Sequence, residues 1–295
     1  MTVNDTRVLD GHRVTITHPD KVMYPSTGMT KSDVVDYMEA IAPHLLRHAS
    51  SRAATRKRWI NGVGTADSPG EGFFHRNLDD DTPSWIRTRT LRHADHSNRY
   101  PLLDSVAVLA WYAQHGTVEF HVPQWRFGGR GKHLPPDRIV LDLDPGQGVS
   151  LVQCAEVAFS VRDTLAQRHI ESVPVTTGSK GIHVYGRLDG SLSSDAATEL
   201  ALDVARGIEN AQSRLVTTAM SKSERDGKVF LDWSQNRASK TTVAPYSLRG
   251  RTRPWVACPR TWKELSSSDL AQVQHDEALA LVTSRGDPLA PLAAQ

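Results

Sequence analysis

The order of expected strands and helices between Arg138 and Trp233 limits the fold more than any other feature of this 295-residue sequence. Hydrophobic periodicity there predicts a strand, a helix, two strands, a second helix and a last strand. The six segments are 138–144, 150–170, 173–178, 181–188, 193–211 and 228–233. This βαββαβ order is that of a ferredoxin-like sheet with both helices on one face. The other face of the sheet can then carry a site.

The first of these strands, RIVLDLD, holds two acids within an apolar run. Side chains alternate across a strand, so Asp142 and Asp144 share one face while Leu141 and Leu143 take the other. The topology can bring Asp232, which ends the last strand, beside them. Adjacent carboxylates repel one another unless a proton or a cation intervenes. Three of them can hold two metal ions for nucleotidyl or phosphoryl transfer, whereas the plainer interpretation is that each acid meets solvent at a strand end.

A tight turn, GSKG, separates two of the expected strands. Ser179, Lys180 and the turn's backbone N–H groups could bind a phosphate, and His183 shares the face of the acids. An ordinary hairpin turn is equally compatible with these residues. His121, in VEFHVPQW, lies on the polar side of its strand and is either a site residue or a structural histidine. No GxxxxGK[ST] loop occurs, so a P-loop enzyme is not expected.

The sequence before residue 135 predicts an α/β lobe. Val14 and Ile16 alternate in a strand, Thr30 caps a helix through about Leu46, and a second helix ends at Gly116. The segment 61–99 is rich in Gly, Asp and Pro and predicts loops around short strands. We therefore expect a single domain over 1–295, with an N-terminal lobe at about 1–135, an acid-bearing core at about 136–235 and a basic C-terminal segment at about 236–295.

The net charge of +2 conceals two stretches that lack acids, 47–58 and 233–263. Together they could form a groove that follows a phosphate backbone, or they could be two solvated faces. Phe73 and Phe74, in GEGFFHRN, are either a platform for base stacking or an anchor for their loop. Lys31 at a helix start, with Lys21 nearby in sequence, is a plausible phosphate ligand.

The remaining features concern the cellular compartment. The two cysteines, Cys154 and Cys258, are isolated in sequence, which does not indicate a disulfide framework or a thiolate zinc site. No apolar run is long enough to suggest a membrane span, and the polar N-terminus is unlike a signal peptide. We expect a cytoplasmic, nucleoid-associated protein that does not bind membranes.

Seven segments resemble one family in the same order along the chain. They are HPDKVMYP, TRKRW, HVPQWRF, LDLDPG, TTGSKGIHVY, FLDWSQN and KTTVAPYSLRGR. DLD, SKGIH and LD match the three motifs of the archaeo-eukaryotic primase-polymerase superfamily. The full set is similar to the polymerase domain of the bacterial end-joining ligase D and its stand-alone relatives, from about His12 to Trp262. The resemblance implies an α+β primase-polymerase fold with an RRM-like catalytic sheet.

The resemblance also implies an activity and a set of site residues. It implies a template-dependent polymerase that fills gaps and extends ends in non-homologous end joining, using two Mn²⁺ or Mg²⁺ ions and often favouring ribonucleotides over deoxyribonucleotides. Asp142, Asp144 and Asp232 would hold the metals. Nucleotide-binding residues would be Ser179, Lys180, His183, His121, Gln235, Lys240 and Arg249. DNA-binding residues would be Lys21, Lys31, Lys57, Arg58, Phe73, Phe74, Arg225 and Arg251, with the first two lysines on a 5′-phosphate.

Two other functions remain open on the residues alone. The DxD pair could belong to a metal-dependent phosphatase, although Pro145 and Gly146 follow it where that chemistry usually has a hydroxyl residue. A ferredoxin-like sheet can also be a non-catalytic RNA-binding module, but such modules carry aromatic residues on the open face. The sequence lacks the KxDG motif of a ligase, so we expect either a separate polymerase or a piece of a longer protein. The family resemblance implies Ku and a DNA ligase as partners.

Overall fold

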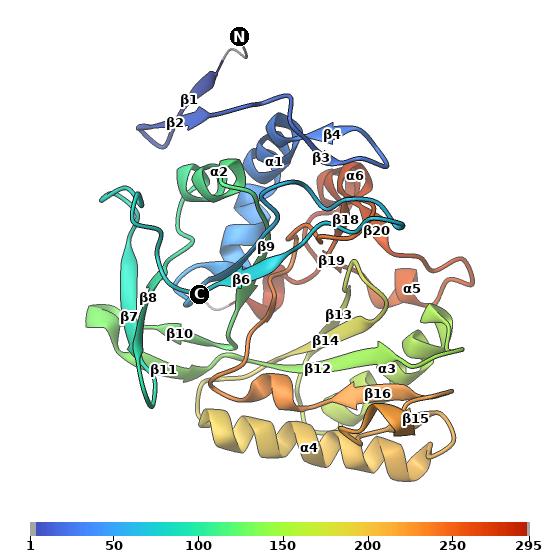
Figure 1. Ribbon diagram of the computed structural model, residues 1–295. Coiled ribbons are helices and arrows are strands. Elements are labelled where there is room, and N and C mark those ends of the chain that lie inside the picture. Colours follow the sequence, from blue (N-terminus) through green and yellow to red (C-terminus); the bar gives the residue numbers. More distant parts are fainter. Residues whose placement is uncertain (1–3, 294–295) are drawn as a thin grey trace. The chain divides into compact units, whose positions relative to one another are not determined.

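The computed structural model describes residues 4–293, which form two compact units (Figure 1). The first unit comprises residues up to Val122 with Val243–Val256 and Gln274–Ser284. The second comprises Pro123–Thr242, Ala257–Val273 and the residues from Arg285 onward. We describe each unit by itself. The division of one domain near residues 135 and 235 stays a prediction.

The second unit contains the predicted βαββαβ sheet. Its elements are β12 (Arg138–Pro145), α3 (Leu151–Ala166), β13 (Ser172–Thr176), β14 (Ile182–Arg187), α4 (Ser194–Ala211), β15 (Val216–Thr217), β16 (Val229–Asp232) and β19 (Cys258–Pro259). The strands lie in the order β15-β16-β12-β14-β13-β19, and β12 is antiparallel to both of its neighbours. The predicted order of strands and helices is therefore confirmed, with two short edge strands added.

The alternation of side chains along β12 explains how this sheet packs. Leu141 and Leu143 are fully buried with Ile182, Val184 and Leu231 in one apolar cluster that also includes residues of α3 and α4. Both helices therefore cover the same face of the sheet. Their starts are fixed by Ser150 and Ser193, whose hydroxyls accept backbone N–H groups of the first turn. The opposite face of β12 carries Asp142.

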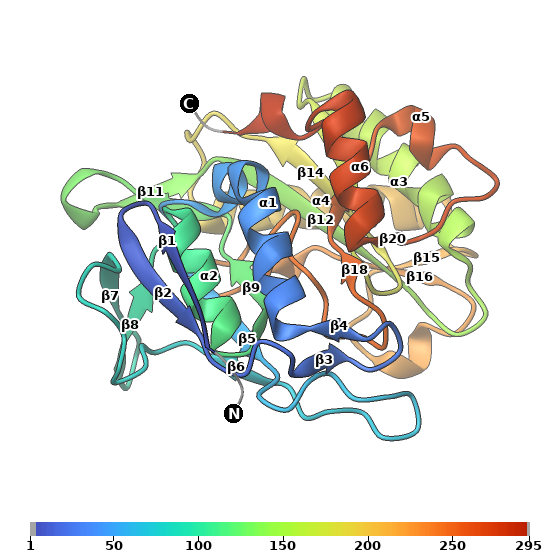
Figure 2. The ribbon, with the colours of Figure 1, turned by 90° about the horizontal axis from the view of Figure 1, so that it is seen from above.

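The first unit combines helices with short strands. Its elements are β1 (Asp5–Leu9), β2 (His12–Ile16), β3 (Val22–Tyr24), β4 (Met29–Thr30), α1 (Lys31–Ala49), β5 (Thr55–Arg58), β6 (Phe73–His75), β7 (Thr88–Arg92), β8 (Ser97–Pro101), α2 (Val106–Gln114), β9 (Thr117–Val122) and β18 (Trp255–Val256), and α6 (His275–Arg285) lies in it except for its last residue. Strands β9, β5 and β6 are neighbours in one sheet. Helices α1 and α2 pack side by side in this unit (Figure 2).

Helix α1 begins where the sequence predicts and ends later. Thr30 and Asp33 form a reciprocal capping box at its start. The helix continues past Pro43 to Ala49, whereas the sequence predicted an end at about Leu46. A proline inside a helix removes one backbone hydrogen bond, at a cost of about 3 kcal/mol. Here the buried side chains on both sides of Pro43, among them Ile41 and Leu45, offset that cost by packing.

The remaining elements are short. They are β10 (Trp125–Phe127), β11 (His133–Pro136), β17 (Thr242–Val243), α5 (Trp262–Leu265), β20 (Val273–Gln274) and four 3₁₀ turns at Gly129–Gly131, Lys222–Glu224, Ser234–Asn236 and Ala290–Leu292. Over residues 4–293, no helix is both long and apolar enough to cross a membrane.

Candidate active site

Three polar side chains lie in one row across the second unit's sheet. Asp142 on β12 is paired with Asp232 on β16 and with His183 on β14. Directly paired residues share a face, with Cβ atoms about 5 Å apart. Asp144 follows two residues later on the same strand and so faces the same side. The predicted acids and His183 therefore meet on the face opposite the helices.

Two of these carboxylates are engaged by protein donors. His183 Nε2 lies 3.2 Å from Asp142 Oδ1. Asp232 accepts hydrogen bonds from the Ser234 backbone N–H at 2.8 Å and from Gln235 Nε2 at 3.0 Å. Among the described residues, no three His, Cys, Asp or Glu side chains converge closely enough to surround a metal ion.

Asp144 lies beside this row and carries a shifted pKa. Desolvation by surrounding atoms and repulsion from Asp142 raise its pKa to about 7, with Asp232 adding to the repulsion. Because the side chain is exposed to solvent, repulsion between the carboxylates matters more here than desolvation, and a bound cation would remove that repulsion. Carboxylate oxygens are the ligands that Mg²⁺ and Mn²⁺ prefer. The donor set therefore fits hard divalent ions.

His183 also has an atom without a protein partner. Its side chain is buried, and within residues 4–293 its Nδ1 finds no hydrogen-bond partner. A buried polar atom without a partner is costly in free energy, so it is usually completed by water or a ligand. The unsatisfied nitrogen marks this face of the sheet as a place where a polar ligand can bind.

The GSKG turn lies against the strand that carries the acids. A Cβ atom on Gly181 would fall 2.0 Å from the carbonyl oxygen of Leu143, so only glycine allows this approach. The Gly178 N–H is donated to Gln272 and the Ser179 N–H to Thr177 Oγ1. These two backbone N–H groups already have protein acceptors, so they are not the groups that would bind a phosphate. The side chains of the turn, above all the exposed Lys180, remain as its phosphate-binding candidates.

A second close approach follows Asp144. A Cβ atom on Gly146 would lie 1.7 Å from the Arg225 carbonyl oxygen, and the Gly146 N–H donates to Lys228 O at 2.8 Å. The Arg225 guanidinium lies 3.5 Å from the centre of the Phe230 ring and lowers the pKa of Asp144 slightly against the larger opposing causes. Lys240, in the same unit, is exposed on a turn.

In the first unit, both faces of β9 are buried. His121 therefore lies among protein groups and does not face solvent. His121 Nε2 lies 2.7 Å from Glu119 Oε2, and Glu119 also accepts the Gly250 N–H at 2.9 Å. The Arg249 Nε atom lies 3.4 Å from Glu119 Oε1. Burial raises the pKa of Glu119, but Arg249 and His121 together hold it well below its usual range.

The two phenylalanines of β6 point to opposite faces of their sheet. Phe74 is paired with Lys57, whose ammonium lies 5.1 Å from the ring centre, and its ring meets His121 edge-on at 5.2 Å. Phe73 is paired with Arg58 on the other face. Both rings are exposed, at 43% for Phe73 and 51% for Phe74. They therefore offer two separate stacking surfaces rather than one continuous platform.

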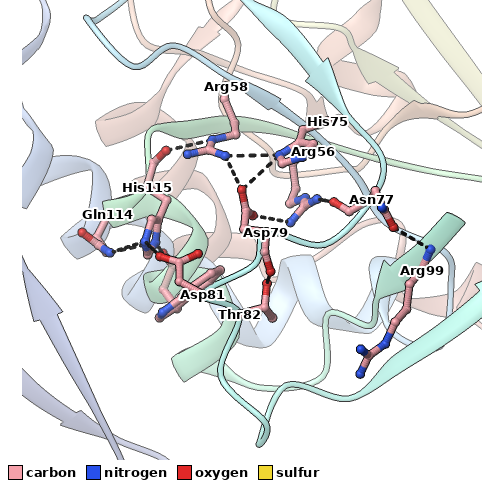
Figure 3. A network of polar contacts seen from close by, with 11 residues as sticks. Arg56, Arg58, His75, Asn77, Asp79, Asp81, Thr82, Arg99, Gln114 and His115 are labelled. Atoms are coloured by element: carbon pink, nitrogen blue, oxygen red, sulfur yellow. Dashed lines mark hydrogen bonds and ion pairs between the residues drawn. The ribbon is translucent and has the colours of Figure 1, made fainter.

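Arg58 belongs to an ion network beneath β6 (Figure 3). Asp79 lies between Arg56 and Arg58, at 3.0 Å and 2.6 Å, and contacts His75 at 3.3 Å. The Arg56 side chain is completely buried and also donates to the Asn77 carbonyl. Arg58 further donates to the His115 carbonyl at 3.0 Å. These guanidinium groups are held by protein acceptors, so contact of Arg58 with DNA stays a prediction.

Lys21 and Lys31 lie close enough to influence each other. Burial and the charge of Lys21 lower the pKa of Lys31. Lys31 donates to Thr17 O at 2.6 Å, and Lys21 donates to Ile60 O at 2.6 Å. Two adjacent ammonium groups at the start of α1 form an electropositive site suited to an anion. Arg251 is exposed in the same unit.

Several residues around these sites carried no usable signal in the sequence. Asp79 stands in a DDD run without a distinguishing pattern. Glu119 is an exception, because its position two residues before His121 places both side chains on one face of the strand. Asn236 is buried and exchanges two hydrogen bonds of 2.8 Å with the backbone of Val140 on β12. Gln272 lies 91 residues from the Gly181 carbonyl that it binds. Only the fold brings such distant partners together.

Comparison with known proteins identifies the family of the chain. The family model "LigD, primase-polymerase domain" matches residues 30–289. The chain is 51% identical over 282 residues to the multifunctional non-homologous end joining protein LigD of Mycobacterium bovis, a match that covers 94% of this chain and 36% of that protein. It is 29% identical over 257 residues to the bifunctional LigD of Bacillus subtilis, covering 87% of this chain and 40% of that one. The chain thus spans well under half the length of these curated relatives.

A solved structure gives the same result for the fold. The polymerase domain of Mycobacterium tuberculosis Ligase D, in complex with DNA, aligns with a TM-score of 0.91 and 51% identity. The alignment covers 96% of this chain and 99% of that one. The predicted α+β fold class and family are both confirmed, and the chain belongs to the LigD primase-polymerase domain family.

Proposed function

We propose that the chain is a template-dependent polymerase that fills gaps and extends broken DNA ends in non-homologous end joining, with a preference for ribonucleotides. Its family and its similarity to a Ligase D polymerase domain in complex with DNA support this function. In the longer relatives this segment is one part of a protein named for end joining. A Ku protein and a DNA ligase are therefore the expected partners, and the chromosomal DNA of the cytoplasm is the expected location.

The row of acids is the observation that supports the chemistry most directly. Asp142, Asp144 and Asp232 hold two Mn²⁺ or Mg²⁺ ions in this proposal. The raised pKa of Asp144 indicates negative charge that the protein leaves uncompensated. When bound, the ions supply activation of the attacking hydroxyl and stabilisation of the leaving pyrophosphate.

The chain's other side chains bind and orient the substrates. Ser179, Lys180 and His183 hold the triphosphate, and the unsatisfied Nδ1 of His183 supports a polar ligand there. Gln235 keeps Asp232 oriented through its side-chain amide. Lys240, Arg249 and His121 complete the nucleotide-binding set.

DNA is bound mainly by cationic and aromatic side chains. Lys21 and Lys31 contact the 5′-phosphate of a gap or broken end, since two adjacent ammonium groups favour a doubly charged anion. Phe74 with Lys57 stacks on the template strand, because an exposed ring beside a cation suits a base next to a phosphate. Phe73, Arg58, Arg225 and Arg251 make additional contacts.

The test is nucleotide incorporation into a 5′-phosphorylated gapped duplex, with each NTP or dNTP and with Mn²⁺ or Mg²⁺ in turn. Incorporation that follows the template and needs a divalent ion is expected. The 5′-phosphate should increase the efficiency of nucleotide incorporation about tenfold, because a charge-assisted hydrogen bond contributes about 1.4 kcal/mol or more to binding. Lys21→Ala should remove that preference, whereas Lys132→Ala, a change at another exposed lysine, should keep it. Absence of incorporation under every cation would refute the proposal.

A further inference from the structure

The GSKG turn is braced by a side chain from a remote part of the second unit. Gln272 Oε1 accepts the Gly178 N–H at 2.7 Å, and Gln272 Nε2 donates to the Gly181 carbonyl at 3.2 Å. One amide group thus joins the two ends of the turn, with Ser179 and Lys180 between them. A planar amide with one donor and one acceptor fits two backbone groups at a fixed separation. The N–H and the hydroxyl of Thr177 also donate to the Gly181 carbonyl, at 3.1 Å each, so Gln272 adds a second support to the turn.

The surroundings of the turn make this brace important. On one side, Gly181 lies against the Leu143 carbonyl between the two aspartates of β12. On another side, the turn borders an open pocket of about 690 Å³ that is lined by Ser179, Lys180, Gln272 and the segment between Pro145 and Leu151. A turn that faces open space gains little from packing there. The hydrogen bonds at the two ends of the turn therefore contribute to the position of its backbone.

We propose that Gln272 is a positioning residue for nucleotide binding, because it holds the GSKG turn so that Ser179 and Lys180 meet the triphosphate. The proposal rests on the polymerase function proposed above. In this proposal Gln272 acts by holding the turn rather than by binding the nucleotide itself. Its loss should weaken nucleotide binding while leaving DNA binding and the chemical step largely unchanged.

Gln272→Met tests this role because methionine keeps the length of the side chain and loses both hydrogen bonds. The KM for the incoming nucleotide should rise about fivefold, because the variant loses one to two partly exposed hydrogen bonds. The kcat and the KM for gapped DNA should change by less than about twofold. Gln272→Glu keeps the acceptor, loses the donor and adds a negative charge, so its nucleotide KM should rise further and should improve with added salt.

A matched control is Gln212→Met in the same unit. Gln212 is also half-buried, and its amide donates to Ser160 Oγ at 2.7 Å, at the end of α4. It should lower stability about as much as Gln272→Met without changing the nucleotide KM. An equal rise in the KM for nucleotide and DNA in Gln272→Met, or no rise at all, would overturn the positioning role.

Hydrogen exchange separates this proposal from the polymerase function. The amides of Gly178–Gly181 should exchange several-fold faster in Gln272→Met than in the wild type or in Gln212→Met. This measurement needs no substrate. If the wild type incorporates no nucleotide, the polymerase proposal fails while the brace can still be measured. If exchange at the turn is unchanged, the brace fails whatever the activity is.

Discussion

The two units treat strand carboxylates in opposite ways. In the first unit, Glu119 on β9 is surrounded by Arg249, His121 and a backbone N–H, and its pKa lies well below the usual range. In the second unit, Asp144 on β12 stands beside Asp142, and its pKa rises to about 7. Both acids occupy regular strands within folded units. What differs is whether the protein itself provides the compensating positive charge.

This difference separates structural acids from candidate catalytic acids. A carboxylate that is paired within the chain stabilises the fold and has little capacity left for a ligand. A group of carboxylates without enough internal cations destabilises the metal-free protein and gains from any divalent ion that binds. The contrast thus favours the acids of β12 and β16 as the candidate site, on grounds independent of any relative.

The largest expected effect comes from removing a carboxylate of the second unit. Asp142→Ala should lower nucleotide incorporation about a thousandfold, because metal binding contributes several kcal/mol to the transition state. Its thermal stability should stay equal or rise, since one repelling charge disappears. Single-turnover incorporation and a melting curve, each without and with Mn²⁺, measure the two effects. Wild-type incorporation by the variant would contradict the metal assignment.

The first unit should respond in the opposite way. Asp79→Ala leaves the buried guanidinium of Arg56 without its carboxylate, so the free energy of unfolding should fall by about 3 kcal/mol. Urea denaturation measures the change. Asp81→Ala in the same loop is the matched control, because its ion pair with His115 is exposed and its loss should cost less than about 0.5 kcal/mol. Equal effects of the two substitutions would remove the distinction between the network and its surroundings.

The pH dependence of stability sharpens the comparison further. Because the pKa of Glu119 is lower in the folded protein than its ordinary 4.5, the stability that its carboxylate provides is present above pH 4.5 and is lost as the pH falls below it. Glu119→Gln should therefore be less stable than the wild type at pH 7. The difference should shrink, by on the order of 2 kcal/mol, as the pH falls below 4.5. Denaturant titrations across this range would show it.

Asp144 should show the reverse sign in the same titrations. Its folded-state pKa of about 7 exceeds the ordinary 3.8, so the folded protein holds the extra proton and stability falls as the pH rises through that window. Asp144→Asn should remove this fall. The magnitude is small because the side chain is exposed. If both variants changed stability in the same direction with pH, the contrast between the units would fail.

The smallest expected effect distinguishes the two faces of β6. Phe74→Leu should weaken binding of gapped DNA about fivefold, because Phe74 shares its face with Lys57 and His121. Phe73→Leu should weaken it less, since its face is shared with the Asp79 network. Fluorescence anisotropy at fixed ionic strength compares the two. A larger effect at Phe73 would reverse the assignment of the template-facing side.

The sequence alone predicted the sheet and its row of acids because alternation is a local property. Leu141 and Leu143 identify the buried face of β12, and this places Asp142 on the other face. The capping residue Thr30 likewise acts within a few positions of the helix that it starts. Such features depend on short-range geometry that every strand and helix shares.

Other features could not be predicted because their partners are distant in sequence. The charge of Arg249 acts on His121, and the Gly250 N–H binds the neighbouring Glu119, although both residues lie far along the chain from β9. The opposite directions of Phe73 and Phe74 could not be predicted, because their segment was expected to be a loop and forms a strand. The length of α1 depended on packing strong enough to outweigh Pro43. Each of these is a property of the tertiary structure rather than of a local pattern.

The pairing of β12 with β14 and β16 couples folding to function. A slip of one residue in this register would move Asp142 under the helices and bring Leu143 to the open face, which the apolar core would not tolerate. The same contacts that stabilise the core therefore also fix the alignment of the acids. Protein molecules that unfold at the native melting temperature therefore have this register. In them the acids are aligned before any metal or DNA binds.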